Sequence, residues 1–559
     1  MKKLPVGTSD FRELREYDKY FVDKSMLIKE VIDDEAKIVL LPRPRRFGKT
    51  LNLTMLRWFF ELTEDKKERK KLFSGLFIEK DNIFEEHLSK YPVIYLTFND
   101  IKGIKSENTF YKIKDSIGYE FSQHAYLLQS DIMDSFEIQE FNDIIQRKAD
   151  ISVYERSLIK LSRYLHKYYK QKVIILIDEY DTPIHAAFYH GYYEECISFF
   201  KGFLGAGLKD NPDIFKGVIT GILRIAKESI FSDMNNIGVY SLMKEEYSDF
   251  FGFTETEVLE LATECNVKGH FDDIKQWYDG YIFGKSTIYN PWSILNFMSG
   301  KDKNCHPYWA NTASNSLIKE IIAKAPGLIK RELYDLLKDT ALVKRIEENI
   351  SFENLKTNET TVYSFLLFSG YLKAYDCYKN ERRDYCSIMI PNEEVKKIFE
   401  DVIIDWINEA YRDSDKLRIM LEALVKGDAK VFEEILNDFV ITTLSYFNTG
   451  GKKDVEKVYQ AFILGLLVNL AGDYEVSSEK ESGFGRYDIS IVPQDINNKA
   501  IIMELKKINS DETKDTALAS ALAQIEEKKY ETAIKARGIK DIKKLAVVFD
   551  GKRVWVKSA

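Results

Sequence analysis

The stretch AKIVLLPRPRRFGKTLNLTMLRWFFELT, residues 36–63, decides the fold of the N-terminal half of the chain. It consists of an apolar strand pattern, a polar loop and a helix pattern, and a further strand pattern, YPVIYLTF, follows at 91–98. Two later runs, KVIILIDEYD at 172–181 and FKGVITGI at 215–222, are apolar without alternation. Such runs are typical of central parallel strands that are covered on both faces. The sequence therefore predicts an α/β domain with helices on both faces of a parallel sheet.

The loop within this stretch partly matches the phosphate-binding pattern GxxxxGK[ST]. Gly48, Lys49 and Thr50 fit the pattern, whereas Arg43 occupies the position of the first glycine. In such loops, backbone N–H groups at a helix N-terminus bind phosphate, the lysine reaches the β- and γ-phosphates, and the hydroxyl binds Mg²⁺. A GKT triplet after a strand also arises by chance in surface turns. The candidate nucleotide-binding residues of the loop are Arg46, Phe47, Gly48, Lys49 and Thr50.

Two carboxylates, Asp178 and Glu179, follow the apolar strand pattern at 173–177. Asp178 can hold Mg²⁺ through water and Glu179 can polarise the attacking water, because phosphoryl transfer needs metal, positioning and charge neutralisation. The alternative is that both acids cap the next helix. Because Lys49 and Thr50 precede them in the expected order, we favour an ATP site with Mg²⁺.

Two further residues follow the next strand pattern. Thr220 ends that strand, where its hydroxyl could sense the γ-phosphate, and Arg224 comes one turn later as a candidate charge stabiliser. Structural capping explains either residue equally well. We include both among the nucleotide-binding candidates.

The segment EKESGFGRYDISIVPQDINNKAIIMELKKI, residues 479–508, contains two strand patterns joined by a polar turn around Ile496. A hairpin symmetric about this turn places Asp488 opposite Glu504, with Lys506 next on the same face. Facing carboxylates repel each other, so a divalent cation such as Mg²⁺ or Mn²⁺ is the natural compensation, and Lys506 could orient a water molecule. The alternative is an ordinary hairpin with solvent-facing charges. It is disfavoured because the second strand is apolar on both faces.

Several motifs together resemble one family, the AAA-ATPase-like proteins of bacteria and archaea that carry a C-terminal PD-(D/E)XK nuclease domain. In that family an arginine commonly replaces the first glycine of the phosphate-binding loop. The resemblance implies a P-loop ATPase core at 1–240, an accessory or lid subdomain at 241–345, a helical connecting region at 346–445 and a nuclease-like α/β domain at 446–559. The motifs are RPRRFGKT (43–50), LIDEYD (176–181), TGILRIAKESIFSDMNN (220–236), FGFTETEV (251–258) and WYDGYIFG…YNPWS (277–293).

The resemblance also implies roles for residues of the C-terminal segment. Asp488, Glu504 and Lys506 correspond to the PD-(D/E)XK motif, and Glu456 on the first helix of that domain corresponds to an additional metal-binding acid. Gln460 stands where the family commonly has a histidine, which removes a proton shuttle and puts full activity in doubt. The residues implied to contact nucleic acid are Arg486, Gln524 and Tyr530.

The composition sets limits on the class of protein. With 559 residues, 45% hydrophobic and 30% charged, the chain is large enough for several cores and typical of globular proteins. The net charge of −8 means that nucleic acid would bind through a local basic surface. Five scattered cysteines without a CxxC pair predict neither a disulfide framework nor a zinc site. The N-terminus lacks an apolar signal and the longest apolar run, 461–471, is too short to span a bilayer, so we expect a cytoplasmic protein without membrane contact.

The function that these patterns favour is ATP binding and hydrolysis coupled to a metal-dependent nuclease that acts on nucleic acid, with DNA the favoured substrate. The resemblance adds the hypothesis of defence against foreign DNA. It also suggests self-association, because related ATPases often form rings. One alternative is a nucleotide-dependent regulatory switch whose nuclease-like domain only binds nucleic acid or a partner. Another is a scaffold with two vestigial sites, which the retained charged residues disfavour.

Overall fold

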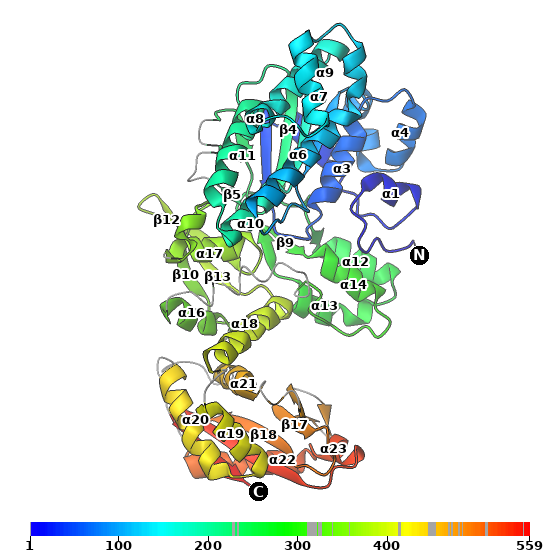
Figure 1. The fold of residues 1–559 in the computed structure, drawn as a ribbon. Helices are drawn as coiled ribbons and strands as arrows, with labels where there is room; N and C mark the ends of the chain where they lie inside the picture. Colours follow the sequence, from blue (N-terminus) through cyan, green and yellow to red (C-terminus); the bar gives the residue numbers. More distant parts are fainter. Residues whose placement is uncertain are drawn as a thin grey trace. The chain divides into compact units, whose positions relative to one another are not determined.

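The computed structural model divides the chain into two compact units (Figure 1). The first contains Met1–Ile318 and Val343–Val395, and the second contains Lys319–Leu342 and Lys396–Ala559. The structure describes residues 2–225, 230–231, 234–309, 321, 327–337, 339–356, 358–411, 415–444, 454–467, 470, 473–478, 481–482, 485–508, 512–551 and 553–559.

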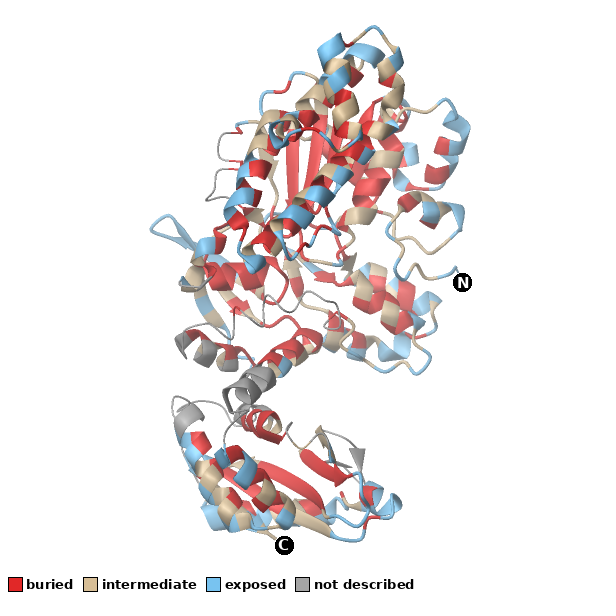
Figure 2. Cartoon of the chain, viewed as in Figure 1, coloured by how far each residue is buried: buried red, intermediate tan, exposed pale blue. Residues whose placement is uncertain are grey.

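A parallel sheet forms the centre of the first unit, with strand order β2-β3-β4-β1-β6. Its central strands are buried, as Figure 2 shows, because their apolar side chains meet helices on both faces. Helix α3 (Lys49–Phe60) packs against β2, β3 and β4, and α9 (Ser157–Tyr169) packs against β3. The predicted α/β fold is confirmed. The strands are β1 (Ile38–Pro42), β2 (Val93–Thr97), β3 (Val173–Asp178), β4 (Ile214–Gly221) and β6 (Ile237–Val239).

The register of this sheet brings several polar side chains to one edge. Thr97 at the end of β2 pairs with Asp178 at the end of β3, and Thr220 on β4 pairs with Leu41 on β1. Strand β4 separates β1, which leads into the phosphate-binding loop, from β3, which carries the acids. The carboxyl edge of a parallel sheet is where ligands bind in such folds, and here it gathers residues from four strands.

An accessory segment follows the sheet in the same unit. It contains the antiparallel sheet β7-β9-β8 and helices whose apolar faces form a separate core, including Tyr278, Tyr289 and Phe297. Helix α12 begins with a capping box in which Thr254 and Glu257 bind each other's backbone N–H groups. The elements are β7 (Phe253–Thr254), α12 (Glu255–Glu264), α13 (Phe271–Tyr278), β8 (Tyr281–Phe283), β9 (Ser286–Tyr289) and α14 (Pro291–Ser299).

The mainly helical middle of the chain also contains a sheet that the sequence did not predict. Strands β10 (Leu342–Ile346), β13 (Arg383–Met389) and β12 (Lys373–Asn380) pair in that order. The β12–β13 hairpin is largely exposed and polar, so it lacks the apolar pattern that marks a buried strand. Cys377 and Cys386 form a disulfide across it. The sequence predicted no disulfide framework and did not indicate this single pair, which hairpin pairing brings together across nine positions.

The second unit contains a five-stranded sheet of order β14-β17-β18-β19-β20. Strands β17 (Ile489–Pro493) and β18 (Ala500–Lys507) are antiparallel, with Ile489 opposite Met503 and Ile491 opposite Ile501. This register confirms the hairpin symmetric about residue 496. Helix α22 (Lys514–Glu527) connects β18 to the parallel strand β19 and packs on both. Strand β14 was not predicted, because its side chains are only partly buried.

The remaining elements complete the description. In the first unit they are α1 (Phe11–Glu16), α2 (Leu27–Asp33), α4 (Lys66–Phe73), α5 (Asn82–His87), α6 (Ser106–Gln123), α7 (Ser135–Ile145), α8 (Ile151–Glu155), α10 (Thr182–His190), α11 (Tyr193–Leu208), β5 (Arg224–Ile225), β11 (Asn349–Ile350) and α17 (Glu359–Phe368). In the second they are α16 (Gly327–Leu337), α19 (Asp415–Lys426), α20 (Ala429–Leu444), α21 (Asp454–Leu467), β14 (Tyr474–Ser478), β15 (Glu481–Ser482), β16 (Gly485–Arg486), α23 (Thr532–Ala536), β19 (Ile542–Asp550) and β20 (Arg553–Ser558), while α18 (Glu393–Tyr411) spans the division. No helix within these described segments is long and apolar enough to cross a membrane.

Candidate active sites

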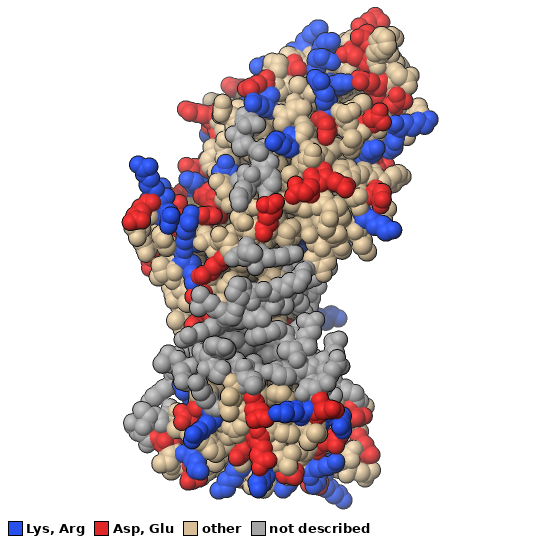
Figure 3. Space-filling view, turned by 60° about the vertical axis from the view of Figure 1, so that its left-hand side comes forward, with Lys and Arg blue, Asp and Glu red and all other residues tan. Residues whose placement is uncertain are grey.

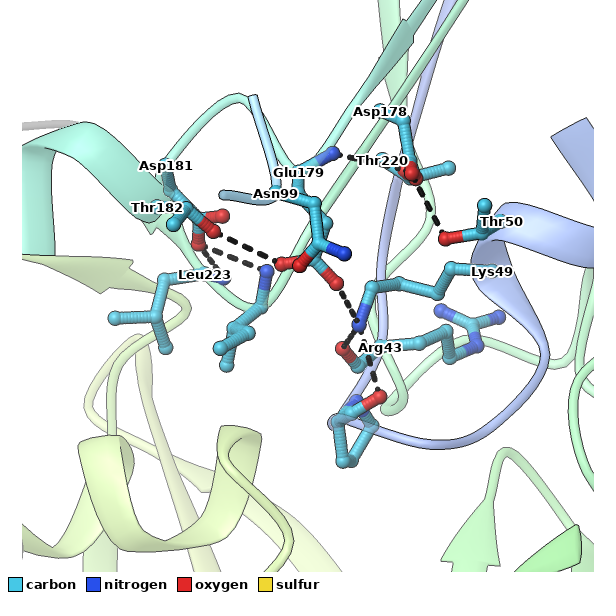
Figure 4. A network of polar contacts seen from close by, with 12 residues as sticks. Arg43, Lys49, Thr50, Asn99, Asp178, Glu179, Asp181, Thr182, Thr220 and Leu223 are labelled. Carbon is cyan, nitrogen blue, oxygen red and sulfur yellow. Dashed lines mark hydrogen bonds and ion pairs between the residues drawn. The ribbon is translucent and has the colours of Figure 1, made fainter. Parts of the chain in front are cut away.

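Lys49 lies at the start of α3, directly after the left-handed Gly48, which has a φ of 83°. Only 3% of Lys49 is exposed, and its Nζ lies 3.0 Å from Glu179 Oε1 (Figure 4). The same Nζ donates to the carbonyls of Arg43 at 3.1 Å and Pro44 at 3.0 Å. The sequence thus places a buried ammonium at a helix N-terminus, where backbone N–H groups also favour an anion.

Asp178 is completely buried and is surrounded by hydroxyl donors. Thr220 donates to its Oδ1 at 2.7 Å, while Thr50 at 2.8 Å and Thr97 at 3.4 Å donate to its Oδ2. Burial and the nearby Glu179 carboxylate raise the pKa of Asp178 to about 6. Because charge on this carboxylate is costly, a cation beside it would be strongly favoured.

Glu179 occupies the left-handed region with a φ of 54°, and its side chain points toward Lys49. Thr182 donates to its Oε2 at 3.1 Å. Helix α10 begins after Asp181, whose carboxylate instead accepts from the backbone N–H groups of Ile222 and Leu223. The helix-capping alternative for Asp178 and Glu179 therefore has no support in the geometry.

Arg43, at the position of the missing glycine, is a buried brace and does not line the cavity. Its guanidinium donates to the carbonyls of Tyr240 at 2.6 Å and Tyr247 at 3.1 Å. It also lies over the rings of Phe251 and Phe283, at 5.0 and 5.4 Å from their centroids. Burial lowers the pKa of Arg43 to about 9. This arginine thus ties the phosphate-binding loop to the segment that precedes the accessory sheet.

A cavity of about 380 Å³ adjoins the loop. Among its described lining residues, Glu179 is the single acid, which faces several cations. Asn99 and Lys102, which belong to no sequence motif, also line it, as does Arg45, a loop residue that was not among the predicted ones. On the face drawn in Figure 3, acidic and basic side chains are interspersed. Other lining residues are Tyr20, Phe21, Lys24, Arg46, Phe47, Lys49, Thr50, Phe250, Phe253, Trp292 and Leu295.

The remaining nucleotide-site candidates fall into two groups. Arg46 and Phe47 line the cavity; Arg46 lies 4.3 Å from the ring centroid of Trp292, and Phe47 packs against Tyr281 at 4.9 Å. Thr220 and Arg224 are not among its lining residues. Thr220 holds Asp178, as described above.

Arg224 belongs to the short strand β5, whose pairing partner is β11. The structure therefore places it outside the arrangement formed by Lys49, Thr50, Asp178 and Glu179. The sequence places Arg224 just after a strand near the nucleotide-binding motifs, but nothing in the sequence shows whether its side chain belongs to the nucleotide site.

In the second unit, Asp488 lies one residue before β17, and continuing the observed register places it opposite Glu504. The backbone N–H of Leu505 donates to Asp488 Oδ2 at 2.7 Å. Glu504 is only 3% exposed, and its Oε1 accepts a hydrogen bond from Gln524 on α22. Gln524 lies 3.4 Å from the hydroxyl of the buried Tyr530. The hairpin and α22 therefore bring four of the predicted residues together.

Of the other predicted residues of this unit, two have described side-chain contacts and two are located only by their elements. Lys506 donates to Ser520 Oγ at 2.8 Å, and Gln460 on α21 donates to the backbone carbonyl of Asp488 at 2.9 Å. Glu456 lies one turn before Gln460 on α21, and Arg486 lies in β16. The side chains of Glu456 and Arg486 lie outside the described part of the structure.

The described residues contain no group of three or more histidine, cysteine, aspartate or glutamate side chains that could hold a metal ion. The oxygen donors that lie together are Thr50 with Asp178 in the first unit and Asp488 with Glu504 in the second. Carboxylate and hydroxyl oxygens suit Mg²⁺, which usually takes one or two carboxylates and keeps several waters. Each pair of oxygen ligands therefore fits a magnesium ion that keeps water molecules as its other ligands.

Two family models match the two ends of the chain. Residues 5–231 match the family model described as predicted AAA-ATPase, and residues 454–559 match the PD-(D/E)XK nuclease superfamily. An uncharacterized protein in the vnfD 5' region of Azotobacter chroococcum mcd 1 is 23% identical over 545 residues, which cover 96% of this chain and 94% of that protein. The structure of the Aeropyrum pernix ORC2 protein in ADPNP and ADP complexes aligns with 72% of this chain and 95% of that chain, at 9% identity and a TM-score of 0.24. The N-terminal part of the chain therefore matches a predicted AAA-ATPase, and its C-terminal part matches the PD-(D/E)XK nuclease superfamily.

Proposed function

We propose that the protein binds and hydrolyses ATP in the cavity of the first unit and uses its nucleotide state to control a metal-dependent nuclease in the second. The observation that carries the ATPase half is the convergence of Lys49, Thr50, Asp178 and Glu179 at the carboxyl edge of one sheet. These residues come from a loop and a strand that are more than 120 positions apart. They supply a phosphate-binding ammonium, a hydroxyl, a buried carboxylate and a second carboxylate that can act on water.

Lys49 has two sets of partners that phosphate can replace. In the structure its ammonium donates to two loop carbonyls and pairs with Glu179. The β- and γ-phosphate oxygens of ATP carry more negative charge than carbonyl oxygens, so the ammonium would turn toward them. That movement would weaken the pair with Glu179, whose carboxylate could then accept a proton from the attacking water.

Thr50 and Asp178 would hold the Mg²⁺ that accompanies ATP. When bound, this ion neutralises charge on the transferring phosphoryl group. Thr220 and Thr97 fix the Asp178 carboxylate from the neighbouring strands, so its orientation does not depend on the ligand. Arg43 keeps the loop in place through its carbonyl contacts.

Asp488 and Glu504 would hold the divalent ion of the nuclease site, with Glu456 as a third acid. Lys506 would assist the attacking water, and Gln524 keeps Glu504 in position through its hydrogen bond. Arg486 would contact the phosphate backbone of the substrate. We propose DNA as this substrate and defence against foreign DNA as the setting.

One observation favours a second candidate function, a nucleotide-dependent switch whose C-terminal domain binds nucleic acid without cutting it. Gln460, at the position where the family commonly has a histidine, is engaged with the Asp488 backbone. An amide cannot shuttle protons as an imidazole does. In this alternative the hairpin and α21 form a binding surface, and Asp488 and Glu504 only shape it.

A paired assay on the purified full-length protein separates the two functions. Phosphate release from ATP is measured together with binding and cleavage of linear, circular and single-stranded DNA and RNA, in Mg²⁺ or Mn²⁺. The proposed function predicts ATP hydrolysis and metal-dependent cleavage of at least one substrate. Hydrolysis with nucleic-acid binding but no cleavage under any of these conditions supports the switch instead. Absence of ATP hydrolysis contradicts both.

A further inference from the structure

The loop after β2 presents one lysine to the nucleotide cavity from a firmly anchored backbone. Ile101 is only 5% exposed, and Gly103 on the other side of Lys102 donates its N–H to Thr109 Oγ1 at 3.1 Å. The Tyr192 hydroxyl donates to the Gly103 carbonyl. A side chain at Gly103 would collide with Thr109, since an added Cβ would lie 2.3 Å from its Oγ1. Lys102 therefore extends from a fixed base, and it lines the cavity.

Among the described residues that line the cavity around Lys102, basic side chains outnumber acidic ones. Arg45, Arg46, Lys49 and Lys102 all line the cavity, where Glu179 is the single acid among the described lining residues. Partial burial, followed by repulsion from Arg45, lowers the pKa of the Lys102 ammonium. Like charges in one cavity repel each other and cost free energy in the absence of a ligand. A polyanion removes that cost, and a triphosphate is the polyanion for which Lys49 is already placed.

The order of the strands indicates which phosphate Lys102 would meet. Loops that follow parallel strands emerge at the same edge, so their lateral order is the strand order β2-β3-β4-β1. Lys102 follows β2, Glu179 follows β3, and Lys49 follows β1. The loop of β2 stays close to β3, because Phe98 donates its N–H to the Asp178 carbonyl at 3.0 Å. Lys102 therefore approaches Glu179 from the side opposite to the phosphate-binding loop. The terminal phosphate of a bound triphosphate would lie on this opposite side.

We infer that Lys102 binds the γ-phosphate and makes the cavity discriminate nucleoside triphosphates from diphosphates. This inference rests on the proposed ATP site. Lys49 would contact phosphates present in both nucleotides, whereas Lys102 would contact the phosphate that hydrolysis removes. Loss of that contact would then report hydrolysis to the loop after β2.

The test is calorimetric binding of ADP and of a non-hydrolysable ATP analogue, each with Mg²⁺, to the full-length protein. Lys102→Met should weaken analogue binding about 10- to 100-fold, as expected for a hydrogen bond between charged groups, and change ADP affinity less than about two-fold. Lys102→Arg should restore most of the analogue affinity. Lys105→Met is the matched control, because Lys105 is exposed on the same loop but is not among the residues that line the cavity.

The outcomes separate this inference from the proposed function. If Lys102→Met weakens both nucleotides equally, or weakens neither, Lys102 has no selective contact and the inference is overturned while the ATP site stands. If neither the wild type nor Lys49→Met binds nucleotide, the proposed ATP site fails and this inference fails with it. Unfolding temperatures of Lys102→Met and Lys102→Arg should match that of Lys105→Met, because Lys102 and Lys105 are both exposed.

Discussion

The two candidate sites of this chain are assembled from different kinds of structural elements. In the first unit, Asp178 receives hydrogen bonds from three hydroxyls, and Lys49 contacts a carboxylate and two carbonyls. In the second unit, the backbone N–H of Leu505 donates to Asp488 and the side-chain amide of Gln524 donates to Glu504.

The difference follows from how each site is assembled. The first site lies where four parallel strands end, so its polar groups are fixed by sheet register and by one helix N-terminus. The second combines a hairpin, α21 and α22, whose side chains must meet from separate elements. A site at a sheet edge is preorganised without ligand, whereas a site shared by a hairpin and two helices depends more on metal and substrate for its final geometry. We therefore expect substitutions in the first site to have the more specific effects.

The largest effect should come from Glu179→Gln. The amide keeps the shape and can still accept from Thr182, but it cannot take a proton from water, so ATP turnover should fall about 10²- to 10⁴-fold. Nucleotide affinity should change little, because Lys49 and the loop backbone remain. Phosphate-release kinetics and equilibrium binding check this together. Glu107→Gln, an exposed change on α6, is the control, and unaltered turnover in Glu179→Gln would refute the assignment.

Arg43→Gly restores the glycine of the phosphate-binding pattern and should nevertheless destabilise the first unit. It removes a buried side chain and leaves the Tyr240 and Tyr247 carbonyls without their donor, a loss of about 3 kcal/mol or more. The unfolding transition of the first unit in urea measures this loss of stability. Arg43→Lys, which keeps the charge but not the planar fork, should give an intermediate value. A glycine variant as stable as the wild type would mean that the arginine is not a brace.

Asp488→Asn tests the candidate site of the second unit. It removes a ligand charge but keeps an oxygen for the Leu505 N–H, so cleavage should fall about 100-fold and the fold should persist. ATP hydrolysis should be unchanged in the absence of nucleic acid. The measurement is cleavage rate across an Mg²⁺ titration, with the exposed Glu527→Gln on α22 as control. Equal cleavage by the variant and the wild type would place the metal elsewhere.

Glu394 provides a buried carboxylate that belongs to neither site. It is completely buried and accepts from Ser293 Oγ at 2.7 Å and the Trp309 N–H at 2.7 Å, and burial raises its pKa to about 7. Because the folded pKa lies above that of the unfolded chain, the folded state binds the extra proton between pH 4.5 and 7. Stability from this group is therefore present below pH 4.5 and lost as pH rises through 7.

Glu394→Gln should remove that pH dependence. The variant should gain on the order of 2 kcal/mol relative to the wild type between pH 5 and pH 8, since glutamine does not ionise. Unfolding temperatures across this range provide the measurement. A parallel decline of both proteins would show that Glu394 carries a charge at all these pH values. The result calibrates how strongly burial raises the pKa of a carboxylate that accepts hydrogen bonds, for comparison with Asp178.

The sequence predicted those parts of both sites that depend on local pattern. Lys49 and Thr50 follow a strand in a known loop pattern, and the hairpin about residue 496 follows from two apolar strand patterns on either side of a polar turn. The features that the sequence could not predict depend on tertiary contacts. The role of Arg43 requires the carbonyls of Tyr240 and Tyr247, which lie about 200 positions away. Lys102 belongs to no motif and lines the cavity only because β2 lies beside β3.

The central claim is that nucleotide state controls the C-terminal site. The direct measurement is the rate of metal-dependent cleavage by the full-length protein without nucleotide, with ADP and with a non-hydrolysable ATP analogue, for the wild type and Lys49→Ala. Coupling of about 1 to 3 kcal/mol predicts that the rate changes several-fold to about 150-fold between nucleotide states in the wild type, and that this dependence disappears in Lys49→Ala. Identical cleavage in all three states, by a wild type that binds the nucleotides, would contradict the claim and leave two independent domains.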